Sequence, residues 1–124
     1  MKVITLKQPW ATLVVEGYKK YEFRSWKYNY RGKIYIHAGK GIDKEAMEKI
    51  KHLNLEFPSQ KIIGTVEIND CILLTEEINL RISLENNLLY GNKNRKGYAW
   101  VLQNAHKIDI EKTISGKQGI WNYD

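Results

Sequence analysis

Three charged side chains near the start of the chain have the types and spacing needed to hold a polar, anionic ligand: Lys19, Glu22 and Arg24. Residues 20–26 alternate, which predicts a strand that presents Glu22 and Arg24 on one face, roughly 7 Å apart. Arg24 can offer a planar fork to a phosphate or a base edge, and Glu22 can accept from an exocyclic amine or a water nucleophile. Lys19 follows Gly17, where a helix is expected to give way to this strand, so its ammonium can reach the same side. The simpler interpretation is a surface ion pair worth less than about 1 kcal/mol.

Aromatic and basic side chains interleave in and after this strand, a pattern typical of surfaces that hold single-stranded nucleic acid. A base stacked on an aromatic ring gains roughly 1–3 kcal/mol, and phosphate contacts add a salt-dependent contribution. Tyr21 and Phe23 point the other way along the strand and are expected in the core. The residues predicted to contact nucleic acid are Lys19, Arg24, Trp26, Lys27, Tyr30, Arg31 and Lys33.

The charge of the 124-residue chain is strongly segregated. Its net charge is +6, but residues 1–40 hold nine basic and two acidic residues (net +7), whereas residues 41–124 hold eleven and twelve (net −1). Such segregation favours an anionic partner, with nucleic acid the commonest, although a solvated lysine face would look the same.

The expected elements place these residues in a small α+β domain that spans residues 1–124 and is built on a β-barrel with two or three inserted helices. Apolar and alternating runs predict strands at residues 2–6, 20–26, 33–38, 61–74 and 97–102, and helices near residues 10–17 and 43–53. Gly17 is expected to cap the first helix and Asp43 to begin the second. Residues 75–96 could be helical, broken at Asn86-Asn87, and Asn92 to Lys96 is either a loop that closes over a bound backbone or a solvated hairpin tip.

Several classes of function are not favoured. The lone Cys71 lies in an apolar run and is expected to be buried, which suits a reducing, cytoplasmic location. His37, His52 and His106 lack metal-ligand spacing, so neither a metal nor another cofactor is expected. No apolar stretch approaches the roughly 20 residues of a membrane span, so we expect a soluble protein without a membrane partner.

Six motifs together resemble one known family, the ASCH domain (activating signal cointegrator homology), over residues 2–121. The resemblance implies a PUA-like β-barrel that binds RNA or acts on modified nucleosides, with the lysine and the Glu-x-Arg pair in a cleft between the barrel and the first helix. Carried over, those positions are Lys19, Glu22 and Arg24. The motifs are Gln8-Pro9-Trp10-Ala11, Gly17-Tyr18-Lys19-Lys20-Tyr21-Glu22-Phe23-Arg24-Ser25-Trp26, Tyr30-Arg31-Gly32, His37-Ala38, Gly97-Tyr98-Ala99-Trp100 and Gly116-Lys117-Gln118-Gly119-Ile120-Trp121.

Two further aromatic residues are candidates for lining this cleft. Trp10 lies either at its rim or as an anchor of the first helix, and Tyr98 shares a strand face with Trp100. The predicted partner is RNA, single-stranded nucleic acid or a free nucleoside, and the sequence leaves the oligomeric state open.

A hydrolase is the alternative, with Lys19, Glu22 and Arg24 as the catalytic residues. Some members of the family that the motifs resemble remove an acetyl group from N4-acetylcytidine, and one lineage is a ribonuclease. The amidohydrolases carry a threonine nucleophile three residues after the lysine, where this chain has Glu22. A carboxylate does not readily perform the same acyl chemistry on an amide. Glu22 as general base towards water, with Lys19 or Arg24 stabilising the oxyanion, stays open.

Overall fold

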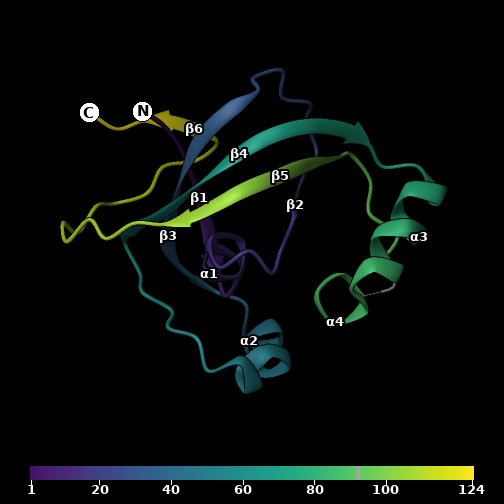
Figure 1. Ribbon diagram of the computed structural model, residues 1–124, viewed down its shortest axis with the longest axis horizontal. Helices are drawn as coiled ribbons and strands as arrows, with labels where there is room; N and C mark the ends of the chain where they lie inside the picture. Colours follow the sequence, from purple (N-terminus) through teal and green to yellow (C-terminus); the bar gives the residue numbers. More distant parts are fainter. Residues whose placement is uncertain (92) are drawn as a thin grey trace.

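Apolar and β-branched runs form the strands of one sheet, and the connections between them carry the helices (Figure 1). The computed structural model describes residues 1–91 and 93–124. Four α-helices are present in this part of the chain, against the two or three predicted. The elements in chain order are β1 (Lys2–Gln8), α1 (Trp10–Val15), β2 (Tyr21–Arg24), β3 (Gly32–Ile42), α2 (Lys44–Ile50), a 3-10 turn (Lys51–Leu53), β4 (Lys61–Leu73), α3 (Glu76–Glu85), α4 (Asn87–Tyr90), β5 (Tyr98–Lys107) and β6 (Ile120–Asn122).

The predicted strands and both predicted helices are confirmed, with one strand shorter than expected. β2 ends at Arg24 instead of residue 26, because its partner β5 begins with Tyr98 directly opposite Arg24. Before Tyr98 the chain turns at Gly97, which has a φ of +98°, a conformation that suits glycine. Because of this turn, β5 offers no residue with which β2 could pair beyond Arg24. Asp43 caps α2 as predicted, accepting a hydrogen bond from the Ala46 N–H at 3.0 Å.

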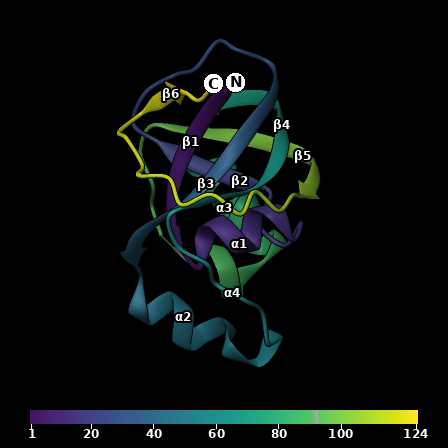
Figure 2. The same ribbon diagram turned by 90° about the vertical axis from the view of Figure 1, so that its left-hand side faces the viewer.

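The six strands form one mixed sheet in the order β2-β5-β4-β3-β1-β6, in which only the pair β1–β3 is parallel among the described residues. The sheet curls over α1, which packs against β1, β3, β4 and β5 (Figure 2). The predicted closed barrel is not confirmed. Within residues 1–91 and 93–124 no ladder joins the edge strands β2 and β6, which have four and three residues and each pair with one neighbour.

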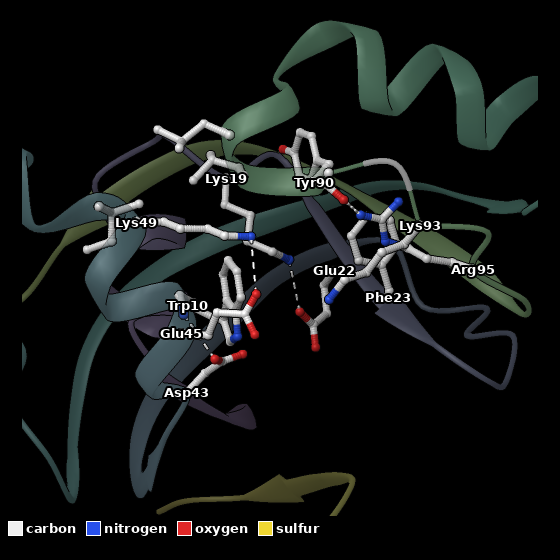
Figure 3. Close-up of a pocket in the computed structure, with 15 residues that line it drawn as sticks. Trp10, Lys19, Glu22, Phe23, Asp43, Glu45, Lys49, Tyr90, Lys93 and Arg95 are labelled. Atoms are coloured by element: carbon white, nitrogen blue, oxygen red, sulfur yellow. Dashed lines mark hydrogen bonds and ion pairs between the residues drawn. The ribbon is translucent and has the colours of Figure 1, made fainter.

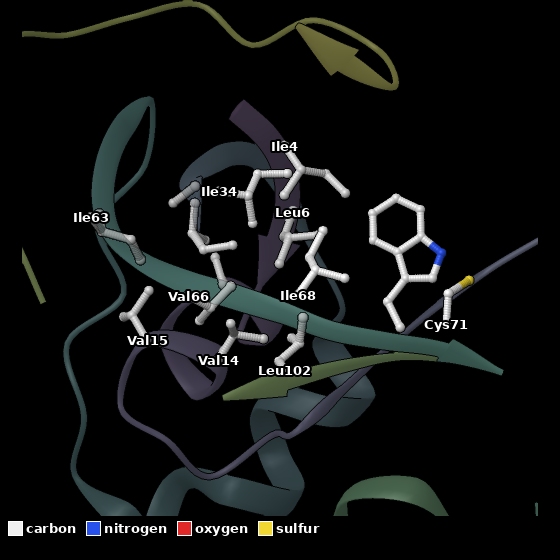
Figure 4. Packing of buried hydrophobic residues seen from close by; sticks show 14 residues of the cluster. Ile4, Leu6, Val14, Val15, Ile34, Ile63, Val66, Ile68, Cys71 and Leu102 are labelled. Carbon is white, nitrogen blue, oxygen red and sulfur yellow. The ribbon is translucent and has the colours of Figure 1, made fainter. Parts of the chain in front are cut away.

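Two apolar clusters fix the helices on the sheet. The larger lies between α1 and the inner face of the sheet and contains the fully buried Trp100, with Cys71 buried at its side as predicted (Figure 4). The second joins the helices to one another through Leu13 of α1, Ile50 of α2 and Ile82 of α3. This second cluster sets the positions of α1, α2 and α4, which surround the cleft described below.

The region with the weakest sequence pattern, residues 75–96, forms two short helices. Thr75 caps α3 by accepting from the Ile78 N–H at 3.2 Å, and Asn86 caps α4 by accepting from the Leu89 N–H at 3.1 Å. The predicted break at Asn86-Asn87 is therefore confirmed, and the asparagine that ends one helix begins the next.

The C-terminal motif anchors the tail to the sheet. Trp121 Nε1 donates to Thr5 Oγ1 at 3.1 Å, and the fully buried His37 contacts both Thr5 Oγ1 (3.2 Å) and the Ile114 carbonyl (2.6 Å). A side chain at Gly116 would come within 2.8 Å of Thr5 Oγ1, so the tail needs glycine there. The two termini lie side by side, with the Met1 ammonium donating to the Tyr123 carbonyl at 3.1 Å. None of the described helices is long and apolar enough to cross a membrane.

Candidate functional site

A cleft of about 310 Å³ lies where α1, β2, α2 and α4 meet (Figure 3). Its walls mix cations, carboxylates and aromatic rings with a few apolar side chains from the second cluster. This volume is close to the lower limit of about 300 Å³ for ligand pockets, so it suits one small ligand. The lining residues are Trp10, Lys19, Glu22, Phe23, Asp43, Glu45, Ala46, Lys49, Ile50, Leu88, Leu89, Tyr90, Gly91, Lys93 and Arg95.

The end of α1 directs Lys19 into this cleft. Gly17 adopts a φ of +85°, the left-handed conformation expected of a glycine after a helix. The amides of Tyr18 and Lys19 then both donate to the Leu13 carbonyl, at 2.9 and 3.0 Å, which turns the chain towards β2. The Lys19 side chain is only 5% exposed as a result, unusual burial for a lysine.

Glu22 lies between two cations, and each of its carboxylate oxygens contacts one of them. Lys19 Nζ lies 3.3 Å from Oε1, and Arg24 Nε donates to Oε2 at 2.9 Å. Glu22 and Arg24 thus share a strand face, as the alternation predicted, with 13% and 25% of their side chains exposed. The pair is therefore largely buried, unlike the surface ion pair of the simpler interpretation.

Burial lowers the pKa of the Lys19 ammonium, and the Glu22 carboxylate opposes this shift. Lys19 also donates to the Tyr21 carbonyl, and its ammonium lies over two aromatic rings, 4.9 Å from the Phe23 centroid and 5.7 Å from that of Trp10. Phe23 was expected in the core. It packs against the second cluster and also lines the cleft.

Arg95 is a cleft residue that the sequence did not predict as an individual site residue. It lies in the predicted basic loop, of which Asn92 falls outside the described residues. The guanidinium lies 4.3 Å from the Phe23 centroid and donates to the Tyr90 carbonyl. Burial lowers the pKa of Arg95 below the ordinary arginine value.

The wall formed by α2 was also missed, because that helix was recognised by its apolar face alone. Lys49 and Glu45 form an i,i+4 ion pair at 3.5 Å on the face next to the apolar one, and both faces border the cleft. Figure 3 shows the ammonium ends of Lys19 and Lys49 directed into the same space from different elements. A helical wheel would have placed Lys49 and Glu45 on one face of α2. The local sequence, however, does not indicate which other elements that face lies against.

The predicted nucleic-acid contacts that follow Arg24 lie outside this cleft, on the connection between β2 and β3. We call residues 25–33 the exterior segment. Trp26 is 38% exposed and packs edge-on against Trp100 at 5.0 Å. Tyr30 donates to the Lys33 carbonyl at 2.8 Å, and Arg31 donates to the Tyr28 and Tyr30 carbonyls at 2.8 and 3.1 Å.

The remaining predicted site residues divide between the two regions. Lys27 and Lys33 are exposed on the exterior segment. Trp10 lines the cleft, whereas Tyr98 packs against the larger apolar cluster and does not contribute to the cleft wall. The structure therefore gathers Trp10, Lys19 and Glu22 at one place. In the described part of the chain no group of three or more His, Cys, Asp or Glu side chains could hold a metal.

Together the open mixed sheet, the helices along one side and the cation-rich cleft define a small α+β domain. The family model of the ASCH domain matches residues 4–113. The chain therefore belongs to the ASCH domain family, as the motifs predicted.

Known relatives support this assignment. The chain is 25% identical to Activating signal cointegrator 1 of Mus musculus over 135 residues and of Homo sapiens over 137 residues. Each match covers 98% of this chain but only 22% of the relative, so the chain spans about a fifth of their length.

Two crystal structures of an ASCH protein from Zymomonas mobilis share the fold. One, of a tyrosine-to-phenylalanine mutant, has a TM-score of 0.63 at 15% identity and covers 99% of this chain and 89% of that one. The unsubstituted ASCH protein has a TM-score of 0.63 at 16% identity, with 99% and 87% coverage.

Proposed function

We propose that this ASCH domain binds RNA or single-stranded nucleic acid and holds one nucleotide, a modified base or a free nucleoside in its cleft. The exterior segment would contact the backbone that leads to the cleft. One observation carries the proposal: the buried Lys19–Glu22 pair lines a cleft of about 310 Å³ together with Trp10, and Arg24 holds the second oxygen of Glu22 from outside the cleft wall.

The chemistry of the cleft suits a base attached to an anionic group. Glu22 accepts hydrogen bonds, whereas Lys19 and Lys49 donate them, so the cleft wall can satisfy the mixed donors and acceptors of a base edge. A base between aromatic and cationic groups gains roughly 1–3 kcal/mol from stacking. The volume is small enough to select one nucleotide rather than a length of strand.

The exterior segment supplies a complementary surface. Lys27 and Lys33 are exposed, and neither has a carboxylate partner among the described residues. Trp26, which directly precedes Lys27, offers an exposed aromatic surface on the same segment. Such positions release counterions when a phosphate backbone binds, which makes affinity fall as salt rises.

Fluorescence anisotropy with labelled single-stranded RNA tests this proposal. We expect binding that weakens steeply with salt, and a much lower affinity for the Lys27→Glu/Lys33→Glu variant. The matched control, Lys112→Glu/Lys117→Glu, makes the same charge change at two exposed lysines of the tail that belong neither to the cleft wall nor to the exterior segment. Equal losses in both variants would show that net charge alone, and not this surface, governs binding.

Hydrolysis is the second candidate, and one observation favours it: burial lowers the pKa of Lys19, whose ammonium contacts Glu22. Perturbed groups of this kind recur at catalytic sites. Binding ranks first because the Glu22 carboxylate, held by one cation on each oxygen, has lone pairs left to accept hydrogen bonds from a ligand, and binding requires no proton transfer to it. Incubation with N4-acetylcytidine and with labelled RNA, compared between wild type, Glu22→Gln and Lys19→Ala, separates the two. Product formation that both substitutions leave unchanged would remove these residues from the reaction.

A further inference from the structure

We infer that Arg95, together with Lys93, forms a phosphate-binding subsite at the α4 end of the cleft. The ligand would then be a nucleotide carrying a phosphate monoester or diester, and a neutral nucleoside would bind weakly. This inference rests on the proposed function and adds a ligand class and two residues to it.

The first argument is that Arg95 is fixed in position before any ligand binds. Asn79, buried in α3, accepts from the Arg95 N–H at 3.2 Å and donates to its carbonyl at 2.7 Å, so both backbone groups are held. The side chain is held separately by its bond to the Tyr90 carbonyl and its stacking on Phe23. A guanidinium that is ordered in advance binds an anion at a lower entropic cost.

The second argument is that Arg95 lacks a counterion. The buried or helical cations of the same cleft have one: Lys19 lies 3.3 Å from Glu22, and Lys49 lies 3.5 Å from Glu45. In residues 1–91 and 93–124 no carboxylate pairs with Arg95, and its Nη1 is buried without a hydrogen-bond partner. A buried donor left unpaired is unfavourable, and an unpaired buried charge is more so. An anion that enters the cleft would relieve both.

The third argument concerns shape. Next to Arg95 the chain turns at Gly91, with a φ of +61°, where a side chain would meet no atom within 4 Å. The wall is therefore open at this end, and the exposed Lys93 borders the same space. A planar fork and a mobile point charge together suit the several oxygens of a phosphate.

The geometry then orders the parts of a nucleotide along the cleft. Trp10 and the Lys19–Glu22 pair border one part of the cleft, on α1 and β2, and Arg95 lies near α4, where it donates to the Tyr90 carbonyl (Figure 3). Phe23 already has Lys19 and Arg95 over its ring and Tyr90 edge-on at 6.0 Å. Trp10 is thus the better platform for the base, with the phosphate at Arg95.

The test compares each of the four ribonucleosides with its 5′- and 3′-monophosphates, by calorimetry on the full chain. For at least one base, wild type is expected to bind a monophosphate about tenfold to a hundredfold more tightly than the nucleoside. Arg95→Gln should remove most of that ratio, because it lowers the affinity for the monophosphate much more than the affinity for the nucleoside. Arg81→Gln is the matched control, because Arg81 is an exposed arginine of α3 paired with Glu77.

The outcomes separate the two proposals. A wild-type ratio near one, with single-stranded RNA still bound, would overturn the subsite and leave the proposed function standing. The same ratio in wild type and Arg95→Gln would also overturn it, whereas no binding of RNA, nucleosides or nucleotides would overturn both. If Arg95→Gln lowers the melting temperature, Arg95→Lys serves instead, because it keeps the positive charge but not the planar pair of N–H donors. Its ratio of monophosphate to nucleoside affinity should be several-fold lower than that of wild type.

Discussion

The cleft takes Lys19 and the exterior segment takes Lys27 and Lys33 from one basic stretch of sequence, yet the two regions treat charge in opposite ways. Lys19 is 5% exposed and pairs with Glu22, whereas Lys27, eight positions later, is exposed. A buried pair is a fixed part of the structure, and its loss leaves an uncompensated charge. Substitution of an exposed lysine changes the stability of the fold very little, and its ammonium can contact a phosphate. One region can therefore recognise a defined group, and the other can only attract an anionic chain.

The largest expected difference between the regions is in stability. Lys19→Met should lower the free energy of unfolding by about 2–4 kcal/mol, because Glu22 Oε1 loses its buried partner. Lys27→Met should change it by less than about 0.5 kcal/mol. Urea denaturation of both variants measures this contrast, and the Lys19→Met/Glu22→Gln double variant should recover part of the loss. Equal effects at the two positions would contradict the assignment of Lys19 to a buried pair.

Substitution of the two tryptophans should separate the regions by ligand. Trp10→Leu removes the ring beside Lys19 and should weaken binding of nucleotide and RNA alike by about 1–3 kcal/mol. Trp26→Leu should weaken RNA binding and leave the mononucleotide unaffected, since Trp26 lies outside the cleft. Calorimetry with a mononucleotide and anisotropy with RNA give the two readouts. Loss of mononucleotide binding in Trp26→Leu would show that the cleft and the exterior segment form a single binding site.

The lysines of the exterior segment should affect chiefly how the affinity for RNA depends on salt concentration. Each of Lys27→Gln and Lys33→Gln is expected to reduce the slope of log affinity against log salt by about 0.7 for a single strand. Lys112→Gln, at an exposed position in the tail, should leave the slope unchanged. Titrations at several salt concentrations measure these slopes, and a similar reduction at Lys112 would remove the special role of residues 25–33.

The smallest effect concerns pH. Since burial lowers the pKa of Lys19 from 10.5, the unfolded chain binds more protons than the folded chain between the lowered value and 10.5. The contribution of Lys19 to unfolding free energy therefore rises with pH across that window and is constant below it. Heteronuclear NMR of the lysine side chains should show the lowered midpoint, and Lys19→Met should lack the alkaline rise. A Lys19 midpoint at or above 10.5 would contradict the burial argument.

The fold and half of the cleft follow from local patterns, whereas the other half depends on contacts between distant segments. Alternation along residues 20–26 places Glu22 and Arg24 on one face, and Gly17 turns Lys19 towards them. Arg95 reaches the cleft only because Asn79 holds its backbone, and no periodicity relates those two residues. Closure of the sheet is equally non-local: several short strands suggested a barrel, but in the described part of the chain no ladder joins the edge strands β2 and β6.

The central claim is that nucleic acid enters the cleft as well as touching the exterior segment, and the four tryptophans test it within one experiment. Trp10 lines the cleft, Trp26 lies on the exterior segment, and Trp121 is fixed in the tail by its bond to Thr5. On adding short single-stranded RNA to ¹⁵N-labelled protein, we expect the indole signals of Trp10 and Trp26 to shift and that of Trp121 to stay. A shift of Trp26 without Trp10 would contradict the claim, because the RNA would then bind outside the cleft.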